Sequence, residues 1–274
     1  MKVIDFHVHL VFKRQWHEEQ YQRMCQISSK ELMDNIEDIM TPAKFHEFLK
    51  NNSVSKAVIL AECSPAVVGI ITNECVIDFC RKNADFIPFC SINPNYDFDP
   101  VGKLEYFVGQ LGAKGLKLLP SSQYFYPNEA RMYNIYAKAQ ELNIPVMFHT
   151  GSSIFKNTRM KYCDLIYLDD VAIDFPKLKI VMAHSGRGYE YEKAFFMSKL
   201  HDNIYMEISG LPPNKLLNYF PDLEKNIDKV IFGSDFPGTP KGIKNNIDVI
   251  KSLPLRSESI EKILWKNAEK VLYE

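Results

Sequence analysis

The hydrophobic positions of the chain fall into short, nearly continuous apolar runs, and each run is followed by a stretch with helical spacing. Continuous rather than alternating apolar residues are typical of parallel strands that are covered on both faces. The intervening stretches carry helix signals, such as Thr41 and Pro42 ahead of Phe45. The predicted strands are Val3–Leu10, Lys56–Cys63, Phe86–Asn93, Gly115–Leu119, Pro145–Thr150, Lys179–His184, Ile204–Ser209 and Val230–Asp235.

This alternation of strand and helix predicts an α/β fold of the (β/α)8 TIM-barrel type, with residues 1–274 as a single domain. Eight units in 274 residues match the usual barrel size. The first two strands lie further apart than the others, because a segment from Val11 to Met40, rich in charged and aromatic residues, is inserted between them. Loops after barrel strands lie on the catalytic face, so we expect this insert to be a lid or a pocket wall. The alternative is a peripheral pair of helices.

Composition narrows the classes of function. The formal net charge of −1 leaves no basic surplus to neutralise phosphates, which argues against a nucleic-acid partner. No apolar stretch approaches the length of a membrane span, and Asp5, His7 and His9 interrupt the first apolar run, so no signal peptide is expected there. We therefore expect a cytoplasmic protein with a small-molecule substrate. Oligomeric state stays open, with a homodimer among the options.

Ionisable residues gather at the ends of the predicted strands. His7 and His9 lie on the first strand, His149 on the fifth and His184 on the sixth, and Asp235 takes the matching position on the eighth. Taken singly, each could be a hydrogen-bonded core histidine or a turn residue. In a barrel these strand ends meet at one mouth, and imidazoles with a carboxylate are ligands that borderline-soft divalent metals prefer. Their joint placement predicts a metal site.

The same residues belong to an ordered set of short motifs that resembles the amidohydrolase superfamily. Within it, the chain is most similar to the amidohydrolase-related group (amidohydrolase 2), the branch that contains aminocarboxymuconate-semialdehyde decarboxylase. The resemblance extends from Val3 to the last helix. The motifs are Ile-Asp-Phe-His-Val-His from Ile4, Gly-Leu-Lys-Leu-Leu-Pro from Gly115, Phe-His-Thr-Gly from Phe148, Ala-His-Ser-Gly from Ala183, Met-Glu-Ile-Ser-Gly from Met206, Phe-Gly-Ser-Asp-Phe-Pro from Phe232 and Ile-Leu-Trp-Lys-Asn-Ala from Ile263.

The resemblance implies a TIM barrel with one catalytic divalent metal, most often zinc, with manganese as the second option. By position, it implies that His7, His9, His149 and Asp235 hold the metal. It places His184 beside the metal as a proton shuttle or as the group that orients the bound water. Asp235 could share this role by accepting a proton from that water.

Two cationic residues have open roles. Lys117, within the fourth predicted strand, could be an ammonium for a substrate carboxylate, a structural core residue, or a carbamylated bridge between two metals as in some branches of the superfamily. Buried lysines shift their pKa readily, which allows such chemistry. Arg187 follows the sixth strand, and if it points inward it favours an anionic substrate.

Three functions follow from this interpretation. The first is hydrolysis of a small-molecule amide, lactone or ester by metal-activated water, which is the majority chemistry of the superfamily. The alternative is metal-dependent decarboxylation of a small unsaturated or aromatic carboxylic acid, which is a C–C lyase reaction. The third is a barrel that keeps a metal for binding or structure only. The identity of the substrate depends on loops whose conformation the sequence does not give.

Overall fold

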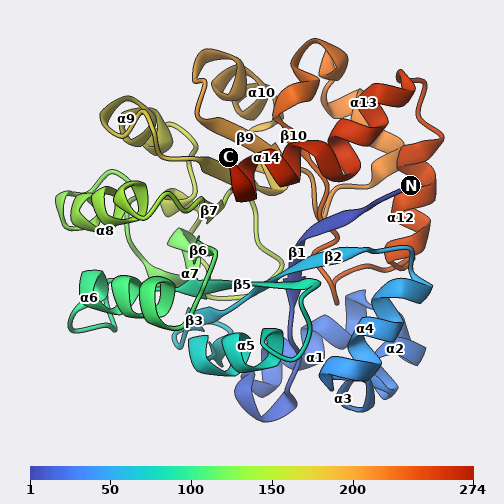
Figure 1. Cartoon of the computed structure of the whole chain (residues 1–274), viewed down its shortest axis with the longest axis horizontal. Coiled ribbons are helices and arrows are strands. Elements are labelled where there is room, and N and C mark those ends of the chain that lie inside the picture. Colours follow the sequence, from blue (N-terminus) through green and yellow to red (C-terminus); the bar gives the residue numbers. More distant parts are fainter.

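The computed structural model describes residues 1–274, and eight parallel strands form its centre (Figure 1). All eight predicted strands are present, each shorter than its apolar run, and the expected (β/α)8 TIM barrel is confirmed. In order around the barrel the strands are β1 (Ile4–His9), β2 (Lys56–Leu60), β5 (Phe86–Ser91), β6 (Gly115–Leu118), β7 (Val146–His149), β8 (Ile180–Ala183), β9 (Ile204–Glu207) and β10 (Val230–Ile231).

The barrel closes between β1 and the segment that follows β10. The prediction of a strand as far as Asp235 is wrong, because β10 ends at Ile231 and the next residues bond to β1 irregularly. The backbone N–H of Phe6 donates to the Phe232 carbonyl over 3.0 Å, and the N–H of Asp235 donates to the His7 carbonyl over 2.9 Å. Local backbone bonds of this kind replace a regular ladder at the seam.

A short antiparallel hairpin follows β2, formed by β3 (Glu62–Ser64) and β4 (Gly69–Ile71). The sequence predicted one strand from Lys56 to Cys63, but β2 ends at Leu60 and the chain then turns into this hairpin. The consequence for function is that Glu62 lies at the carboxyl end of the barrel.

Helices surround the strands, as Figure 1 shows. The helix predicted after Thr41 begins at Pro42, and its Phe45 is fully buried. The α-helices are α1 (Glu18–Ile27), α2 (Lys30–Asp34), α3 (Ile36–Ile39), α4 (Pro42–Asn51), α5 (Asn73–Cys80), α6 (Pro100–Glu105), α7 (Pro120–Gln123), α8 (Ala130–Glu141), α9 (Tyr167–Asp174), α10 (Tyr191–Leu200), α11 (Leu216–Tyr219), α12 (Ile243–Lys251), α13 (Ser257–Glu261) and α14 (Asn267–Tyr273). The 3-10 and π segments are η1 (Lys13–Gln15), η2 (Tyr106–Gln110), η3 (Met160–Tyr162), η4 (His184–Gly186), η5 (Pro213–Lys215), η6 (Leu223–Lys229) and η7 (Lys262–Lys266).

The barrel interior is apolar toward the amino ends of the strands and polar at their carboxyl ends. Phe6 packs edge-on against Phe89 inside the barrel, with ring centroids 5.6 Å apart. The pairing of β1 with β2 shifts register between Asp5 and Val8, which is the signature of a bulge. This bulge lets the consecutive residues Phe6 and His7 both serve the interior, one in the apolar core and one in the polar layer above it.

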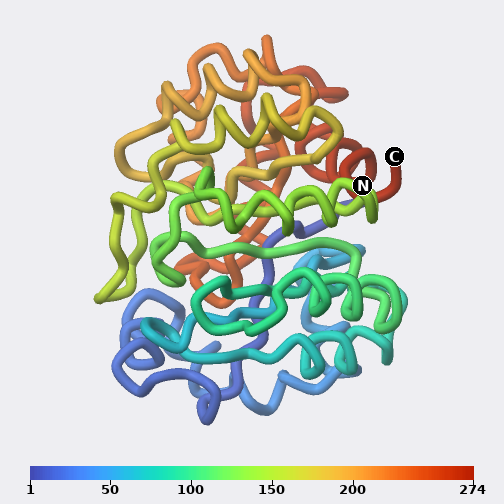
Figure 2. Tube along the Cα trace, turned by 90° about the vertical axis from the view of Figure 1, so that its left-hand side faces the viewer, coloured from blue at the N-terminus to red at the C-terminus, as the bar shows by residue number.

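The C-terminal helix α14 covers the amino ends of the strands. The Lys179 ammonium, at the start of β8, donates to the Val271 carbonyl over 3.2 Å, and Lys56, at the start of β2, lies over the Tyr273 ring. Figure 2 shows both termini at the right of the view, whereas the dark blue coils of the insert lie at the lower left. No helix is long and apolar enough to cross a membrane.

Candidate metal centre

Five ionisable residues from distant parts of the sequence meet at the carboxyl end of the barrel. His7 and His9 lie on β1, and His149 is the last residue of β7. His184 follows β8 directly, and Asp235 lies in the segment after β10. All five line one cavity. The barrel therefore brings together the strand-end residues that the sequence analysis singled out.

Three of these residues present ligand atoms to one point. His7 Nε2 and His9 Nε2 are 3.1 Å apart, and Asp235 Oδ1 lies 3.4 Å from the first and 3.7 Å from the second. Atoms that bind one ion at about 2.0–2.2 Å in a tetrahedral arrangement are separated by roughly 3.3 Å. The three donors therefore fit a single divalent ion.

His149 lines the same cavity but lies outside this tight group. Its Nε2 is buried and has no hydrogen-bond partner. A buried polar atom without a partner costs free energy, so a ligand at this nitrogen would stabilise the site. His149 can thus add a fourth donor to those of His7, His9 and Asp235.

His184 lies beside the ligand group, with its ring centroid 4.9 Å from that of His7 and 4.7 Å from that of His149. Its Nδ1 is 3.0 Å from the backbone oxygen of Ser209. A carbonyl oxygen can only accept a hydrogen bond, so Nδ1 carries a hydrogen and donates it. This bond leaves His184 Nε2 as the nitrogen available for proton transfer within the cavity.

Burial keeps all four imidazoles neutral. It lowers the pKa of His7, His149 and His184 well below the ordinary value, and the nearby Lys117 ammonium lowers the pKa of His7 and His149 further. The same two causes lower the pKa of His9 to about 3. A neutral imidazole has one nitrogen with a free lone pair, which is the form that binds a metal or accepts a proton.

The backbone fixes the Asp235 carboxylate against β1. One oxygen of the buried Asp5 accepts the backbone N–H of Ser234 over 2.8 Å and that of His7 over 3.2 Å, so it joins the two strand ends. Asp235 itself has a left-handed φ of 63°, which is uncommon for a residue with a side chain. Strain of this kind persists where the surrounding structure enforces it and is frequent at functional sites.

Two cations face the ligand group. Lys117, on β6, is fully buried and its Nζ has no hydrogen-bond partner. Burial lowers the pKa of Lys117 to about 8, and the carboxylates of Glu207 and Asp235 offset this effect only in part. The Arg187 guanidinium lies 3.4 Å from Asp235 and donates to the Ser152 carbonyl over 3.0 Å. An anionic ligand in the cavity would neutralise this positive charge.

The sequence analysis missed two buried carboxylates at the same end of the barrel. Glu207 is the last residue of β9 and lies 3.1 Å from His7 Nδ1. Glu62, on β3, lies 3.7 Å from His9 Nδ1 and accepts the Ser64 hydroxyl over 2.6 Å. One signal could have identified Glu207, because it is a charged residue within an apolar strand, just as Lys117 is.

The space over the ligand group is small and covered. Its volume is about 40 Å³, and its wall includes Trp16 and Met24 from the insert and Phe155 from the loop after β7. The rings of Trp16 and Phe155 meet edge to face with centroids 5.9 Å apart, and Lys156 pairs with Glu19 of α1 over 2.6 Å. The inserted segment therefore forms part of the pocket wall, on the side of the molecule away from the termini (Figure 2).

A larger chamber of about 540 Å³ adjoins this space. Ile154, Arg187 and Asp235 line both the chamber and the ligand cavity. Only a small chemical group fits at the ligand cluster itself, so the remainder of a substrate would extend into the chamber. The chamber also presents three amide side chains, those of Asn214, Asn245 and Asn246.

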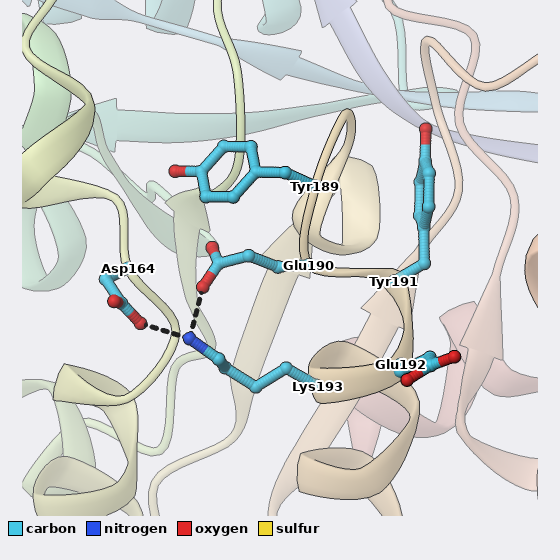
Figure 3. A pocket seen from close by; sticks show the side chains of 6 residues that line it. All are labelled: Asp164, Tyr189, Glu190, Tyr191, Glu192 and Lys193. Atoms are coloured by element: carbon cyan, nitrogen blue, oxygen red, sulfur yellow. Dashed lines mark hydrogen bonds and ion pairs between the residues drawn. The ribbon is translucent and has the colours of Figure 1, made fainter.

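A third hollow, of about 530 Å³, lies apart from the metal ligands, at the amino end of α10. Figure 3 shows its lining residues, with the Lys193 ammonium between two carboxylates. Lys193 Nζ lies 2.6 Å from both Asp164 and Glu190. Lys193 thus already bridges the two carboxylates from within the chain, and none of the predicted site residues lies in this hollow.

Comparison with known proteins agrees with the fold and with the motifs. A family model described as Amidohydrolase matches residues 4–273. No curated protein matches the chain. Among solved structures, an uncharacterized TIM-barrel protein from Bordetella bronchiseptica has a TM-score of 0.83 at 20% sequence identity, with 99% of this chain and 98% of that chain covered.

Two further solved structures have described activities. A dihydroxybenzoic acid decarboxylase from Polaromonas sp. JS666, with bound manganese and the inhibitor 2-nitroresorcinol, has a TM-score of 0.75 at 15% identity and covers 99% of this chain and 96% of that one. A 4-oxalomesaconate hydratase from Rhodopseudomonas palustris has a TM-score of 0.69 at 18% identity and covers 98% and 95%. Other decarboxylases are also among the similar structures, and at these identities the likeness shows the fold alone.

Proposed function

This chain belongs to the amidohydrolase family, and on that basis we propose that it is a metal-dependent decarboxylase of a small unsaturated or aromatic carboxylic acid. One observation carries the choice of substrate. The Lys117 ammonium is fully buried, has no partner and lines the same cavity as the candidate metal ligands. A buried charge without a partner is costly, so a substrate carboxylate is the natural counterion for it.

In this proposal His7, His9 and Asp235 hold one divalent ion and His149 adds a donor. Imidazole and carboxylate donors suit zinc, and they also suit manganese, which is bound in the similar decarboxylase from Polaromonas. When bound, the ion polarises a substrate oxygen and stabilises negative charge that develops during the reaction.

The chain's own residues would supply the remaining chemistry. Lys117 and Arg187 would bind and orient the substrate carboxylate, and the apolar roof around Trp16 would exclude water. When the C–C bond breaks, CO2 leaves and the electron pair stays on the substrate carbon, which must then take up a proton. His184 Nε2 can take a proton from a substrate hydroxyl or from water and return it to that carbon.

The preference for decarboxylation over hydrolysis comes from the comparisons. The sequence led us to expect hydrolysis first, because it is the majority chemistry of the superfamily. The similar structures favour the alternative, since decarboxylases recur among them. Both the decarboxylase and the hydratase described above are named for carboxylic acids, which agrees with the presence of Lys117 and Arg187 in the cavity.

A product assay tests the proposal. The protein, reconstituted separately with Zn²⁺ and Mn²⁺, would be incubated with hydroxybenzoic and unsaturated dicarboxylic acids, and in parallel with amides, lactones and esters. CO2 release and incorporation of ¹⁸O from labelled water would be followed together. We expect CO2 from an acid of the first group, without ¹⁸O in the remaining product, and loss of activity in the His7→Ala variant. A product that gains ¹⁸O without CO2 release would replace the proposal with hydrolysis or hydration.

A further inference from the structure

Beneath the candidate metal ligands lies a buried polar cluster made of Glu207 and Ser209, at the end of β9. Glu207 is fully buried, and Ser209 is 1% exposed. Neither residue belongs to the predicted ligand set, yet together they contact both His7, a candidate ligand, and His184, the candidate proton carrier. A polar cluster at this depth needs complete hydrogen bonding, so its partners are informative.

The Glu207 carboxylate accepts bonds from several directions. Its Oε1 accepts the backbone N–H of Ser209 over 2.7 Å, and its Oε2 accepts the Ser209 hydroxyl over 2.8 Å. The same Oε2 lies 3.1 Å from His7 Nδ1 and 3.3 Å from the backbone nitrogen of His184. Both backbone N–H groups beside this carboxylate, those of Ser209 and His184, therefore point their hydrogens at it.

The cluster could be taken for a second metal site, because His7, His184 and Glu207 present ligand atoms close to one another. The Ser209 hydroxyl argues against this. Its oxygen lies 3.0 Å from His7 Nδ1, 3.0 Å from His184 Nδ1 and 2.8 Å from Glu207 Oε2. A hydroxyl oxygen therefore occupies the centre where an ion would have to lie, and the cluster is a hydrogen-bond network.

The network determines which nitrogen of His7 carries the hydrogen. The single hydroxyl hydrogen of Ser209 is used toward Glu207, so the neighbours of His7 Nδ1 are two acceptors. With Glu207 ionised, His7 Nδ1 donates, which leaves the lone pair on Nε2, the atom that faces His9 Nε2 and Asp235. A histidine ligand is commonly held in this way by a carboxylate behind its other nitrogen.

The Glu207 carboxylate lies close against the backbone of Gly233. A Cβ at Gly233, in the segment after β10, would lie 2.2 Å from Glu207 Oε1 and 2.8 Å from the Cβ of His7. The absence of a side chain at residue 233 thus allows the carboxylate to approach His7 closely.

We propose that Glu207, supported by Ser209, is a positioning residue that fixes the His7 ring and directs its Nε2 lone pair toward the metal. The same pair holds His184 through its backbone N–H and through the Ser209 carbonyl, so one network sets the orientation of a ligand and of the proton carrier. This inference rests on the metal site of the proposed function and adds a residue to which the motif comparison assigned no role.

The chain offers a matched control in Glu62. This second carboxylate is also buried at the carboxyl end of the barrel and lies behind the other histidine of β1. Its distance of 3.7 Å to His9 Nδ1 is too long for a hydrogen bond, and that nitrogen has no partner. The proposal therefore predicts unequal effects from removing the two negative charges.

The test measures metal affinity rather than turnover. Purified wild-type protein, Glu207→Gln, Ser209→Ala and Glu62→Gln would be stripped of metal and titrated with Zn²⁺ and Mn²⁺ against a chromophoric chelator. Loss of a carboxylate behind a histidine ligand typically weakens metal binding about 10- to 100-fold. We expect a loss of that size in Glu207→Gln, a smaller loss in Ser209→Ala, and roughly wild-type affinity in Glu62→Gln.

Two further measurements distinguish a role in positioning His7 from a general structural role of Glu207. The melting temperature of the metal-free forms reports folding, and the visible spectrum of the Co²⁺-loaded forms reports ligand geometry. We expect an altered Co²⁺ spectrum in Glu207→Gln that Glu62→Gln does not show. Wild-type zinc affinity in Glu207→Gln, or an equal loss in Glu62→Gln, would overturn the inference.

If Glu207→Gln does not fold, Ser209→Ala decides, and wild-type affinity with an unchanged Co²⁺ spectrum in that variant would overturn the inference. A wild-type protein that binds no metal would overturn the proposed function along with it. A wild-type protein that binds metal but is indifferent to Glu207 would refute only the inference made here. The two failures are thus distinguishable.

Discussion

Replacing Lys117 by methionine should make the protein more stable and less active at the same time. Methionine has a similar length and no charge, so it keeps the packing and removes the buried ammonium. Burial lowers the pKa of Lys117 to about 8, whereas an exposed lysine titrates near 10.4. At about 1.4 kcal/mol per pH unit, the charged lysine costs the metal-free fold roughly 3 kcal/mol at neutral pH.

The sign of this effect depends on pH. Below pH 8 the lysine is charged in both the folded and the unfolded chain, so the full cost is present and Lys117→Met should be more stable by roughly 3 kcal/mol. Between about pH 8 and 10.4 the folded chain loses the proton first, and the advantage of the variant should shrink toward zero. For a chain of this size, 3 kcal/mol corresponds to an increase in melting temperature of roughly 6–12 °C.

Activity should move in the opposite direction. Removing one partner of a buried charge pair costs about 2–5 kcal/mol of binding, so kcat/KM for a carboxylic acid substrate should fall about 30- to 5,000-fold. Calorimetry of the metal-free proteins and steady-state kinetics of the metal-loaded ones would measure the two effects. Lys225→Met serves as the control, because Lys225 is exposed and should affect neither quantity.

The alternatives for Lys117 give different results. A structural core residue would leave kcat/KM unchanged in the folded methionine variant. A carbamylated bridge would show two metal ions per chain in the wild type and fewer in the variant. A less stable and fully active Lys117→Met protein would refute the assignment of this lysine as the counterion of the substrate.

The remaining predictions concern the metal, the candidate proton carrier His184 and the residue Trp16 of the insert, which lines the ligand cavity. Added Zn²⁺ at 1,000 times its Kd should stabilise the metal-free protein by about 4 kcal/mol, and His9→Ala should abolish this gain in a thermal melt; equal stabilisation of both would contradict the ligand assignment. His184→Asn should lower kcat about 100- to 10,000-fold while metal affinity stays near that of the wild type, and a parallel loss of metal would make His184 a ligand instead. Trp16→Ala should raise KM more than it lowers kcat, because Trp16 lines the ligand cavity and is not one of the candidate metal ligands; unchanged kinetics would show that the insert is peripheral.

The amino-acid sequence alone determined the architecture of this protein. Apolar runs such as Ile204–Ser209 are readable because parallel strands covered on both faces need continuous hydrophobicity. The strand-end histidines were also readable, since residues two apart on a strand share a face, and His7 and His9 do bring their Nε2 atoms within 3.1 Å. The spacing of apolar residues and the common direction of the strands were enough to predict both the barrel and the position of these histidines.

Tertiary structure alone decided how the site is supported. The contact between Glu207 and His7 joins residues 200 positions apart, and no local pattern encodes such a pair. The closure of the barrel after Ile231, the bulge near Phe6 and the chamber beside Arg187 likewise depend on how β1 meets the segment after β10 and on how the loops pack. The sequence specifies which groups arrive at the barrel mouth, because strand ends converge there. Hydrogen-bond partners and cavity volume emerge only when distant segments pack against one another.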